Sequence, residues 1–188
     1  MKHIAIFASG NGSNFEAIVS AIKAGELNAT VSLLVCDNPD ARVITRAEIH
    51  GIPVFVFSPK SYPSKEAYET EILVLLQEQG IEYIVLAGYM RLIGSTLLEA
   101  YPNRIINIHP SLLPLFPGKH AIAQAYESGM TETGVTVHYV DEGMDTGPII
   151  AQCKVEIQEA DTLETLARRI HQAEHVLYIQ TLQELFRD

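Results

Sequence analysis

Short apolar runs and longer amphipathic stretches alternate along this chain. Ile4–Ala8 is the first apolar run, and Ser13–Ala24 follows it as the first predicted helix. The further predicted strands are Val31–Cys36, Pro53–Phe57, Ile81–Ala87, Ile105–His109, Val135–Val140 and Ile149–Ile157. The further predicted helices are Ala41–His50, Ser64–Gln79, Ala121–Ser128 and Thr162–Phe186, the last capped by Asp161 or Thr162. This alternation is typical of βαβ units and predicts an α/β fold: a Rossmann-like, doubly wound, mostly parallel sheet with helices on both faces.

Length and composition indicate an ordinary globular chain. With 188 residues, 47% hydrophobic and 19% charged, we expect a single domain over residues 1–188. No apolar run approaches the ~18 residues of a membrane span, and Met1–Phe7 predicts a first strand rather than a signal peptide. Cys36 and Cys153 sit in apolar runs, which predicts free buried thiols in a reducing cytoplasm.

The formal net charge of −10 narrows the class of partner. An acidic chain is a poor surface for nucleic acid or an anionic membrane, so we expect neither as a partner. Anionic small-molecule substrates remain possible, provided that backbone N–H groups, a helix N-terminus or a few basic side chains hold them. The sequence leaves a monomer and a homodimer open.

The stretch Asn107–Pro114 carries the clearest chemistry. Side chains alternate along a strand, so Asn107 and His109 point to the same side where the strand Ile105–His109 ends. Pro110 stops regular pairing because it has no N–H to donate. A carboxamide and an imidazole presented together can stabilise a developing oxyanion and move a proton. The alternative is a strand end whose two polar side chains make only local hydrogen bonds.

A Gly-rich loop, Ser9–Asn14, joins the first predicted strand to the first helix. Its glycines let the backbone turn sharply, and the N–H groups of the first helical turn then point at an anion. The same glycines, with Asp37, also resemble a dinucleotide fingerprint, but Phe15 stands where that fingerprint has Gly or Ala. We therefore favour a monophosphate site, with a plain turn capped by Ser13 or Asn14 as the alternative.

Four polar loops leave the ends of predicted strands, where ligands bind in sheets of this kind. They are Ser9–Asn14, Gly88–Arg91, His109–Pro114 and Asp141–Gly147, and we expect them to converge on one cleft. Asp145 is the candidate partner of His109, because a carboxylate near an imidazole holds its tautomer. The alternative is a turn-forming Asp145, and the neighbouring Asp141 and Glu142 are interpreted as turn and solvent residues.

His171-Gln172-Ala173-Glu174-His175 matches the H-x-x-E-H pattern of some zinc proteases. A catalytic zinc site needs a third protein ligand, and the 13 residues after His175 do not supply the usual distant one. We therefore favour a long amphipathic helix with polar residues on one face. Glu174 would still reach the cleft if that helix packs along the sheet edge.

The ordered set of motifs resembles the glycinamide ribonucleotide formyltransferases, folate-dependent enzymes of purine synthesis. The matching segments are Ser9–Asn14, Ala87–Arg91, Asn107–Pro114, Gly134–Val140 and Met144–Pro148. Each segment alone is a weak signal. Together they occur in the family's order and cover essentially the whole chain, which makes the resemblance highly specific.

The resemblance implies transfer of a formyl group from 10-formyltetrahydrofolate to the amine of glycinamide ribonucleotide, in de novo purine (IMP) biosynthesis. It implies a catalytic trio of Asn107, His109 and Asp145, and no metal. The residues it assigns to glycinamide ribonucleotide are Gly12, Ser13, Asn14 and Glu174. The residues it assigns to the folate are Lys65, Met90, Arg91, Leu92, Ile93, Asn107, Asp141, Glu142, Gly143, Met144 and Asp145.

The chain departs from the family at Lys65, where relatives often carry Arg before Glu-Ala-Tyr. Lys lacks the bidentate fork of Arg, so contact with the glutamate tail of the folate is in doubt there. Other activities stay open as alternatives: a 10-formyltetrahydrofolate hydrolase, which carries an added N-terminal domain, and a non-catalytic nucleotide-binding sensor. A methionyl-tRNA formyltransferase would need a further C-terminal domain and a basic surface, which the sequence does not predict.

Overall fold

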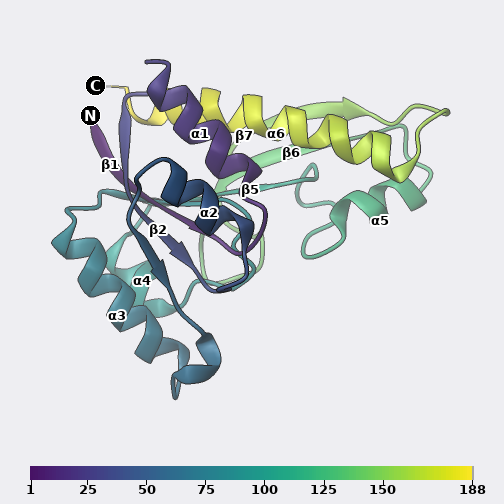
Figure 1. Cartoon of the computed structure of the whole chain (residues 1–188). Helices are drawn as coiled ribbons and strands as arrows, with labels where there is room; N and C mark the ends of the chain where they lie inside the picture. The colour runs from purple at the N-terminus through teal and green to yellow at the C-terminus, as the bar shows by residue number, and fades with distance from the viewer. Residues whose placement is uncertain (188) are drawn as a thin grey trace.

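The computed structural model describes residues 1–187, and a sheet of seven strands forms its centre (Figure 1). The strands are β1 (Lys2–Ala8), β2 (Ala29–Cys36), β3 (Val54–Val56), β4 (Tyr83–Leu86), β5 (Ile105–His109), β6 (Glu132–Tyr139) and β7 (Ile149–Glu156). They are ordered β3-β2-β1-β4-β5-β6-β7. The first five strands in this order pair in parallel, whereas β6 pairs antiparallel with both β5 and β7. The predicted mostly parallel sheet is therefore confirmed.

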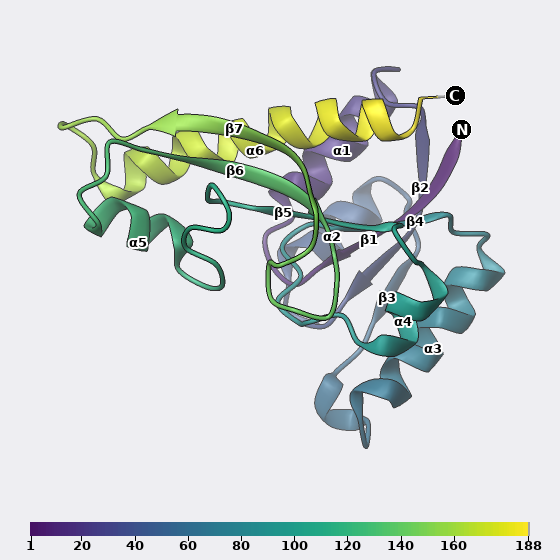
Figure 2. The same ribbon diagram turned by 180° about the vertical axis from the view of Figure 1, so that it is seen from behind.

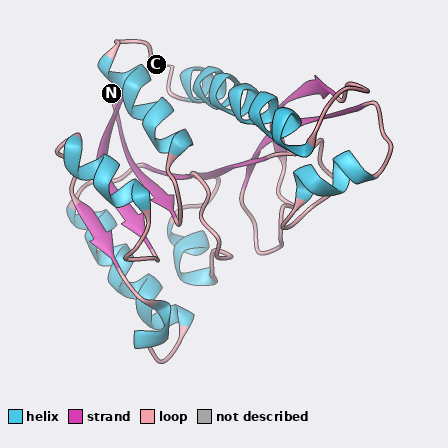
Figure 3. Cartoon of the chain, turned by 45° about the vertical axis from the view of Figure 1, so that its right-hand side comes forward, coloured by secondary structure: helices cyan, strands magenta, loops and turns pink. Residues whose placement is uncertain are grey.

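Helices cover both faces of this sheet, as predicted. They are α1 (Ser13–Lys23), α2 (Arg42–Ile49), α3 (Lys65–Glu78), α4 (Ser95–Ala100), α5 (Ala121–Glu127) and α6 (Leu163–Leu185). Apolar residues of α1, α2 and α6 pack on one face around Phe15 and Leu34, and those of α3 and α4 pack on the other around Phe7 and Ile72. Figures 2 and 3 show the two groups of helices on either side of the strands. The short helix α4 and a 3₁₀ turn at Pro59–Ser61 were not predicted.

The ends of two helices depend on particular side chains. Thr162 caps α6 by accepting a hydrogen bond from Thr165 N at 3.1 Å, so Thr162 and not Asp161 is the cap. At α1 the predicted alternative of a Ser13 or Asn14 cap is wrong, because Gly12 occupies that position with φ 81°. This left-handed conformation is one that glycine adopts without a steric cost.

The long helix α6 is fixed to the middle of the sheet by Tyr178. Its side chain is fully buried, and its hydroxyl lies 2.7 Å from Leu86 O and 3.2 Å from Ile106 O. These carbonyls belong to β4 and β5, so the bond fixes the helix across two neighbouring strands. Glu174 lies one turn earlier and is thereby placed beyond the carboxyl ends of those strands.

The order of strands reverses between β1 and β4, which is the position where open α/β sheets bind ligands. The loops after β1 and β4 therefore flank a crevice at the carboxyl edge. Both cysteines are free, Cys36 buried and Cys153 half-buried. None of the helices described within residues 1–187 combines the length and the apolar character that crossing a membrane requires.

Candidate active site

A cavity of about 780 Å³ opens at the carboxyl edge of the sheet. All four predicted polar loops contribute to its lining, so their convergence is confirmed. The residues expected at the site that line it are Gly12, Ser13, Asn14, Met90, Arg91, Leu92, Ile93, Asn107, His109, Gly143, Met144, Asp145 and Glu174. Three expected residues do not line it: Lys65, Asp141 and Glu142. Further residues line the cavity that the sequence did not predict at the site: the segment Gly118–Ala123, His138 and His171.

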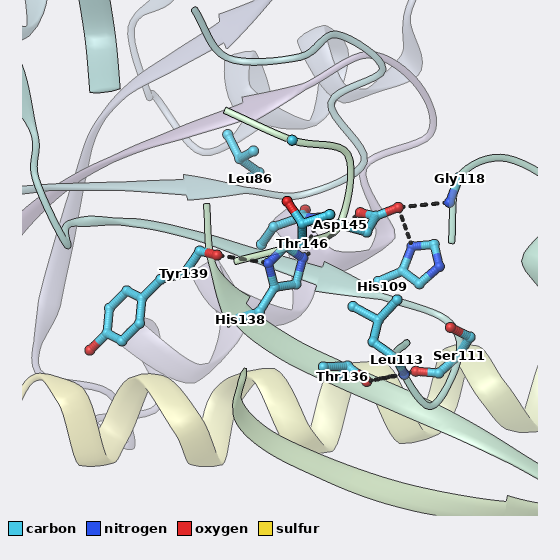
Figure 4. A network of polar contacts seen from close by, with 12 residues as sticks. Leu86, His109, Ser111, Leu113, Gly118, Thr136, His138, Tyr139, Asp145 and Thr146 are labelled. Atoms are coloured by element: carbon cyan, nitrogen blue, oxygen red, sulfur yellow. Dashed lines mark hydrogen bonds and ion pairs between the residues drawn. The ribbon is translucent and has the colours of Figure 1, made fainter. Parts of the chain in front are cut away.

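His109 and Asp145, which both line this cavity, lie close together (Figure 4). His109 Nδ1 lies 3.5 Å from Asp145 Oδ2; the side chain of His109 is buried, and that of Asp145 is 12% exposed. On the other side of the ring, Nε2 donates to Phe116 O at 2.8 Å, so Nε2 carries a proton. Both ring nitrogens thus face acceptor oxygens. The 3.5 Å contact of Nδ1 with Asp145 is long for a hydrogen bond, which leaves this nitrogen able to interact with a ligand as well.

The position of Asp145 depends on its backbone and on one amide. Its φ of 56° is in the left-handed region, which costs a non-glycine residue about 1–2 kcal/mol. Gly118 N donates to Asp145 Oδ2 at 2.8 Å. Earlier in the same loop, Asp141 Oδ1 accepts from Gly143 N at 3.0 Å and from Thr146 Oγ1 at 2.6 Å. Asp141 therefore stabilises the turn that presents Asp145, as its interpretation as a turn residue predicts.

The loop after β5 is fixed by Thr136, a fully buried residue of β6. Thr136 Oγ1 donates to Ser111 O at 2.7 Å and accepts from Leu113 N at 3.1 Å. Gln152 Nε2 reaches both Thr136 Oγ1 at 2.9 Å and Leu113 O at 3.0 Å. The turn after His109 is therefore supported by two neighbouring strands and does not depend on local hydrogen bonds alone.

His138 is a buried histidine of the site that sequence reasoning missed. It lies opposite Asn107 in the antiparallel pairing of β5 and β6, and its Nε2 is 3.2 Å from Asn107 Nδ2. The same nitrogen is 3.8 Å from Asp145 Oδ1, so Asp145 lies between the two imidazoles (Figure 4). Burial lowers the pKa of His138 below its ordinary value. Only the strand register, which an apolar run does not reveal, would have pointed to this residue.

The Gly-rich loop and α6 meet in the lining of the cavity. Asn14 Nδ2 lies 3.4 Å from Glu174 Oε2, and the buried Asn14 Oδ1 has no partner among the described residues. Glu174 is itself buried and lies 2.6 Å from His171 Nδ1 through its other oxygen. The hydrogen bond that His171 donates to the Glu174 carboxylate raises the pKa of His171. The structure therefore brings Glu174 to the cleft along α6, as expected.

Asp37 does not act as the acid of a dinucleotide site, because its carboxylate is paired with Arg91. Arg91 Nε donates to Asp37 Oδ2 at 2.8 Å, and the side chain of Asp37 is 6% exposed. This pair orders the segment after β4, which Ser9 also holds by accepting from Met90 N at 2.9 Å. Lys65 lies behind the same segment, with its Nζ 2.8 Å from Leu92 O. Lys65 therefore contacts the backbone of the predicted folate segment and does not line the cavity. Glu142 is exposed and does not line the cavity either.

The two histidines of the H-x-x-E-H match do not share a site. His171 is bonded to Glu174 and lines the cavity, whereas His175 Nε2 is buried and has no partner within the described chain. Residues 1–187 contain no group of three or more His, Cys, Asp or Glu side chains placed to hold a metal ion. His171 and Glu174 are the polar residues of α6 that line the cavity.

The fold and this cavity define a class of protein. The formyl transferase family matches residues 2–182, and the chain belongs to that family. The chain is 59% identical to a phosphoribosylglycinamide formyltransferase of Bacillus subtilis over 98% of its own length and 95% of the relative's. A protein of the same name from Escherichia coli is 36% identical, over 94% of this chain and 83% of that protein.

Solved structures show the same likeness. A phosphoribosylglycinamide formyltransferase from Bacillus halodurans superposes with a TM-score of 0.97 at 59% identity, covering 100% of this chain and 96% of that one. A glycinamide ribonucleotide transformylase from Geobacillus kaustophilus gives a TM-score of 0.96 at 63% identity, with 98% of each chain covered. The predicted family and fold are thus confirmed.

Proposed function

We propose that this protein transfers the formyl group of 10-formyltetrahydrofolate to the amine of glycinamide ribonucleotide. The products are formylglycinamide ribonucleotide and tetrahydrofolate. The observation that carries the proposal is the shared cavity, in which Asn107, His109 and Asp145 lie between the Gly-rich loop and the apolar segment after β4. Such a cavity has one end suited to a phosphorylated acceptor and another suited to a flat aromatic donor.

The phosphate end is supported by the start of α1. This helix has eleven residues, and its first N–H groups follow Gly12 without a side-chain cap. Unbonded N–H groups and the helix dipole together attract an anion. Glu174 lies beside Asn14 at the same end, where its carboxylate would accept hydrogen bonds from ribose hydroxyls. This arrangement supplies local donors in a protein whose net charge is −10.

The folate end is supported by apolar side chains at the mouth of the cavity. Met90, Leu92 and Met144 all line it and are 44–63% exposed, so several large apolar side chains gather at one place on the surface. A pterin and an aryl ring would cover these side chains and gain the hydrophobic contribution of that burial. We assign this end to 10-formyltetrahydrofolate, with Arg91 and Ile93 in the same wall.

The chemistry then follows from the central residues. The glycyl amine attacks the formyl carbon, and negative charge develops on the formyl oxygen. Asn107 Nδ2 donates to this oxygen, and doubly protonated His109 donates from Nδ1 while Asp145 stabilises the ring. The bond from the formyl carbon to folate N10 breaks as the amine loses a proton. Water beside Asp145 carries that proton to N10, so atoms and charge balance.

The proposal is tested by measuring formyl transfer in variants of the two oxyanion donors. Losing one donor typically costs ~10²–10³ in rate, so Asn107→Ala and His109→Ala should each lower kcat by about that factor. The circular dichroism spectrum of each variant checks that it remains folded. Near-normal turnover in both folded variants would contradict the assignment.

The phosphate end is tested separately at Ser13. Ser13→Asp places a negative charge at the start of α1 and should raise KM for glycinamide ribonucleotide by at least tenfold, leaving KM for the folate unchanged. Ser13→Asn is the matched control, because it has nearly the same shape without the charge. An equal KM for glycinamide ribonucleotide in the two variants would contradict the assignment of its phosphate to this loop.

A further inference from the structure

His138 occupies a position that the proposed reaction does not explain. It lines the cavity yet is only 2% exposed, and it faces Asn107 across the β5–β6 pairing. Burying an imidazole is costly unless both of its nitrogens find partners. The partners of His138 are therefore informative about the state of the ring.

The first partner identifies the protonated nitrogen. His138 Nδ1 lies 2.8 Å from Tyr139 O, and a carbonyl oxygen only accepts hydrogen bonds, so Nδ1 carries a proton. Burial favours the neutral ring and lowers its pKa, as the nearby His109 also does, whereas the hydrogen bond to Tyr139 O and the charges of Asp145 and Asp141 act in the opposite direction. In the neutral ring Nε2 has no proton and needs a donor.

The second partner is that donor. Nε2 lies 3.2 Å from Asn107 Nδ2, and an unprotonated Nε2 can be satisfied only by the amide N–H of Asn107 and not by its carbonyl. We propose that His138 is a positioning residue: its neutral Nε2–acceptor tautomer fixes the side-chain amide of Asn107 so that the second N–H points to the formyl oxygen. This inference rests on the proposed function and adds how the oxyanion donor is oriented.

The alternative orientation shows why this contact matters. A carboxamide turned by 180° about its last torsion would present its oxygen to the developing oxyanion and repel it. A protonated His138 would also direct Nε2–H toward Asp145 Oδ1, now 3.8 Å away, and Asn107 would lose its acceptor. Either change removes the donor without moving the backbone of β5.

A double-mutant cycle tests the inference. His138→Phe keeps a planar ring but removes the acceptor, and should lower kcat by at least ~10-fold, up to the ~10²–10³ cost of losing an oxyanion donor. KM for both substrates should change by less than twofold. In an Asn107→Ala background the same substitution should have no further effect, because His138 acts through Asn107. The control Thr133→Val, also buried on β6, should leave kcat unchanged.

If His138→Phe lowered kcat by the same factor in the unaltered enzyme and in Asn107→Ala, the inference would be overturned. A purely structural role of His138 would act independently of Asn107, so the two losses of kcat would multiply. Nitrogen-15 NMR of the unaltered enzyme provides a second test that does not depend on the folding of a variant. The His138 signals, assigned by comparison with His138→Gln, should show a protonated Nδ1 and a bare Nε2. A proton on Nε2 in the active enzyme would contradict the inference. An inactive unaltered enzyme would instead refute the proposed function.

Discussion

Replacing Gly12 by Ala isolates the cost of a side chain in the phosphate loop. Gly12 has φ +81°, and an added Cβ would lie 2.5 Å from Val43 Cγ2 and 2.7 Å from Val43 Cβ. The helix that carries Val43 has little freedom to move away, because Val43 N donates to Gly10 O at 3.0 Å. The loop, and with it the start of α1, must therefore shift.

Two contributions add up in Gly12→Ala. The left-handed backbone costs about 1–2 kcal/mol with an alanine, and overpacking against Val43 costs ~1–3 kcal/mol more. Gly25→Ala is the matched control: its φ is +76°, but an added Cβ meets nothing within 4 Å. The entropy that alanine removes from the unfolded chain is common to both variants. Their difference therefore isolates the contact with Val43.

The assay is urea denaturation of both variants, followed by steady-state kinetics. Gly12→Ala should lower the free energy of unfolding by about 1–3 kcal/mol more than Gly25→Ala does. It should also raise KM for glycinamide ribonucleotide, because the first N–H groups of α1 move with the loop. Equal destabilisation in the two variants would refute the packing argument, and an unchanged KM would refute the link between this loop and the phosphate.

Three further variants test other contacts of the site. Thr136→Val leaves buried groups of the loop after β5 without partners, so denaturation should show a loss of ~1–3 kcal/mol per orphaned group, and kcat should fall with it. Glu174→Gln should lower the pKa of His171 in an NMR titration. In the unaltered protein the His171–Glu174 pair stabilises the fold fully below the unfolded pKa of His171, which is about 6.5. This contribution is lost as the pH rises through the higher pKa of His171 in the folded protein, and the variant should lack this pH dependence. Arg91→Ala leaves Asp37 buried without its cation; it should raise KM for the folate, and Asp37→Asn in the same chain should restore part of the lost stability.

Sequence patterns predicted the elements that carry strong local signals. The predicted strand Ile105–His109 agrees with β5 at both ends, because an apolar run and Pro110 define it locally. The helix α4 was not predicted because it is short and is preceded by Gly94, whose N–H donates to Glu69 of α3 at 2.8 Å. That bond joins segments 25 residues apart, so no local pattern reveals it.

The difference between local sequence signals and contacts made only on folding also applies to the site. Asn107, His109 and Asp145 belong to polar motifs at strand ends, which is why the sequence could single them out. His138 lies inside an apolar strand, and only its register opposite Asn107 brings it to the cavity. The contacts of Asp37 and Lys65 likewise depend on which loops meet after folding, and spacing along the chain does not contain that information.

We propose that this site transfers a formyl group to the glycinamide ribonucleotide amine and not to water. The most direct measurement uses 10-formyltetrahydrofolate labelled with carbon-13 in the formyl group, with and without the acceptor. We expect the label to appear as an amide carbon of formylglycinamide ribonucleotide, and the folate to keep its formyl group when the acceptor is absent. Labelled formate released at the same rate with and without the acceptor would contradict it.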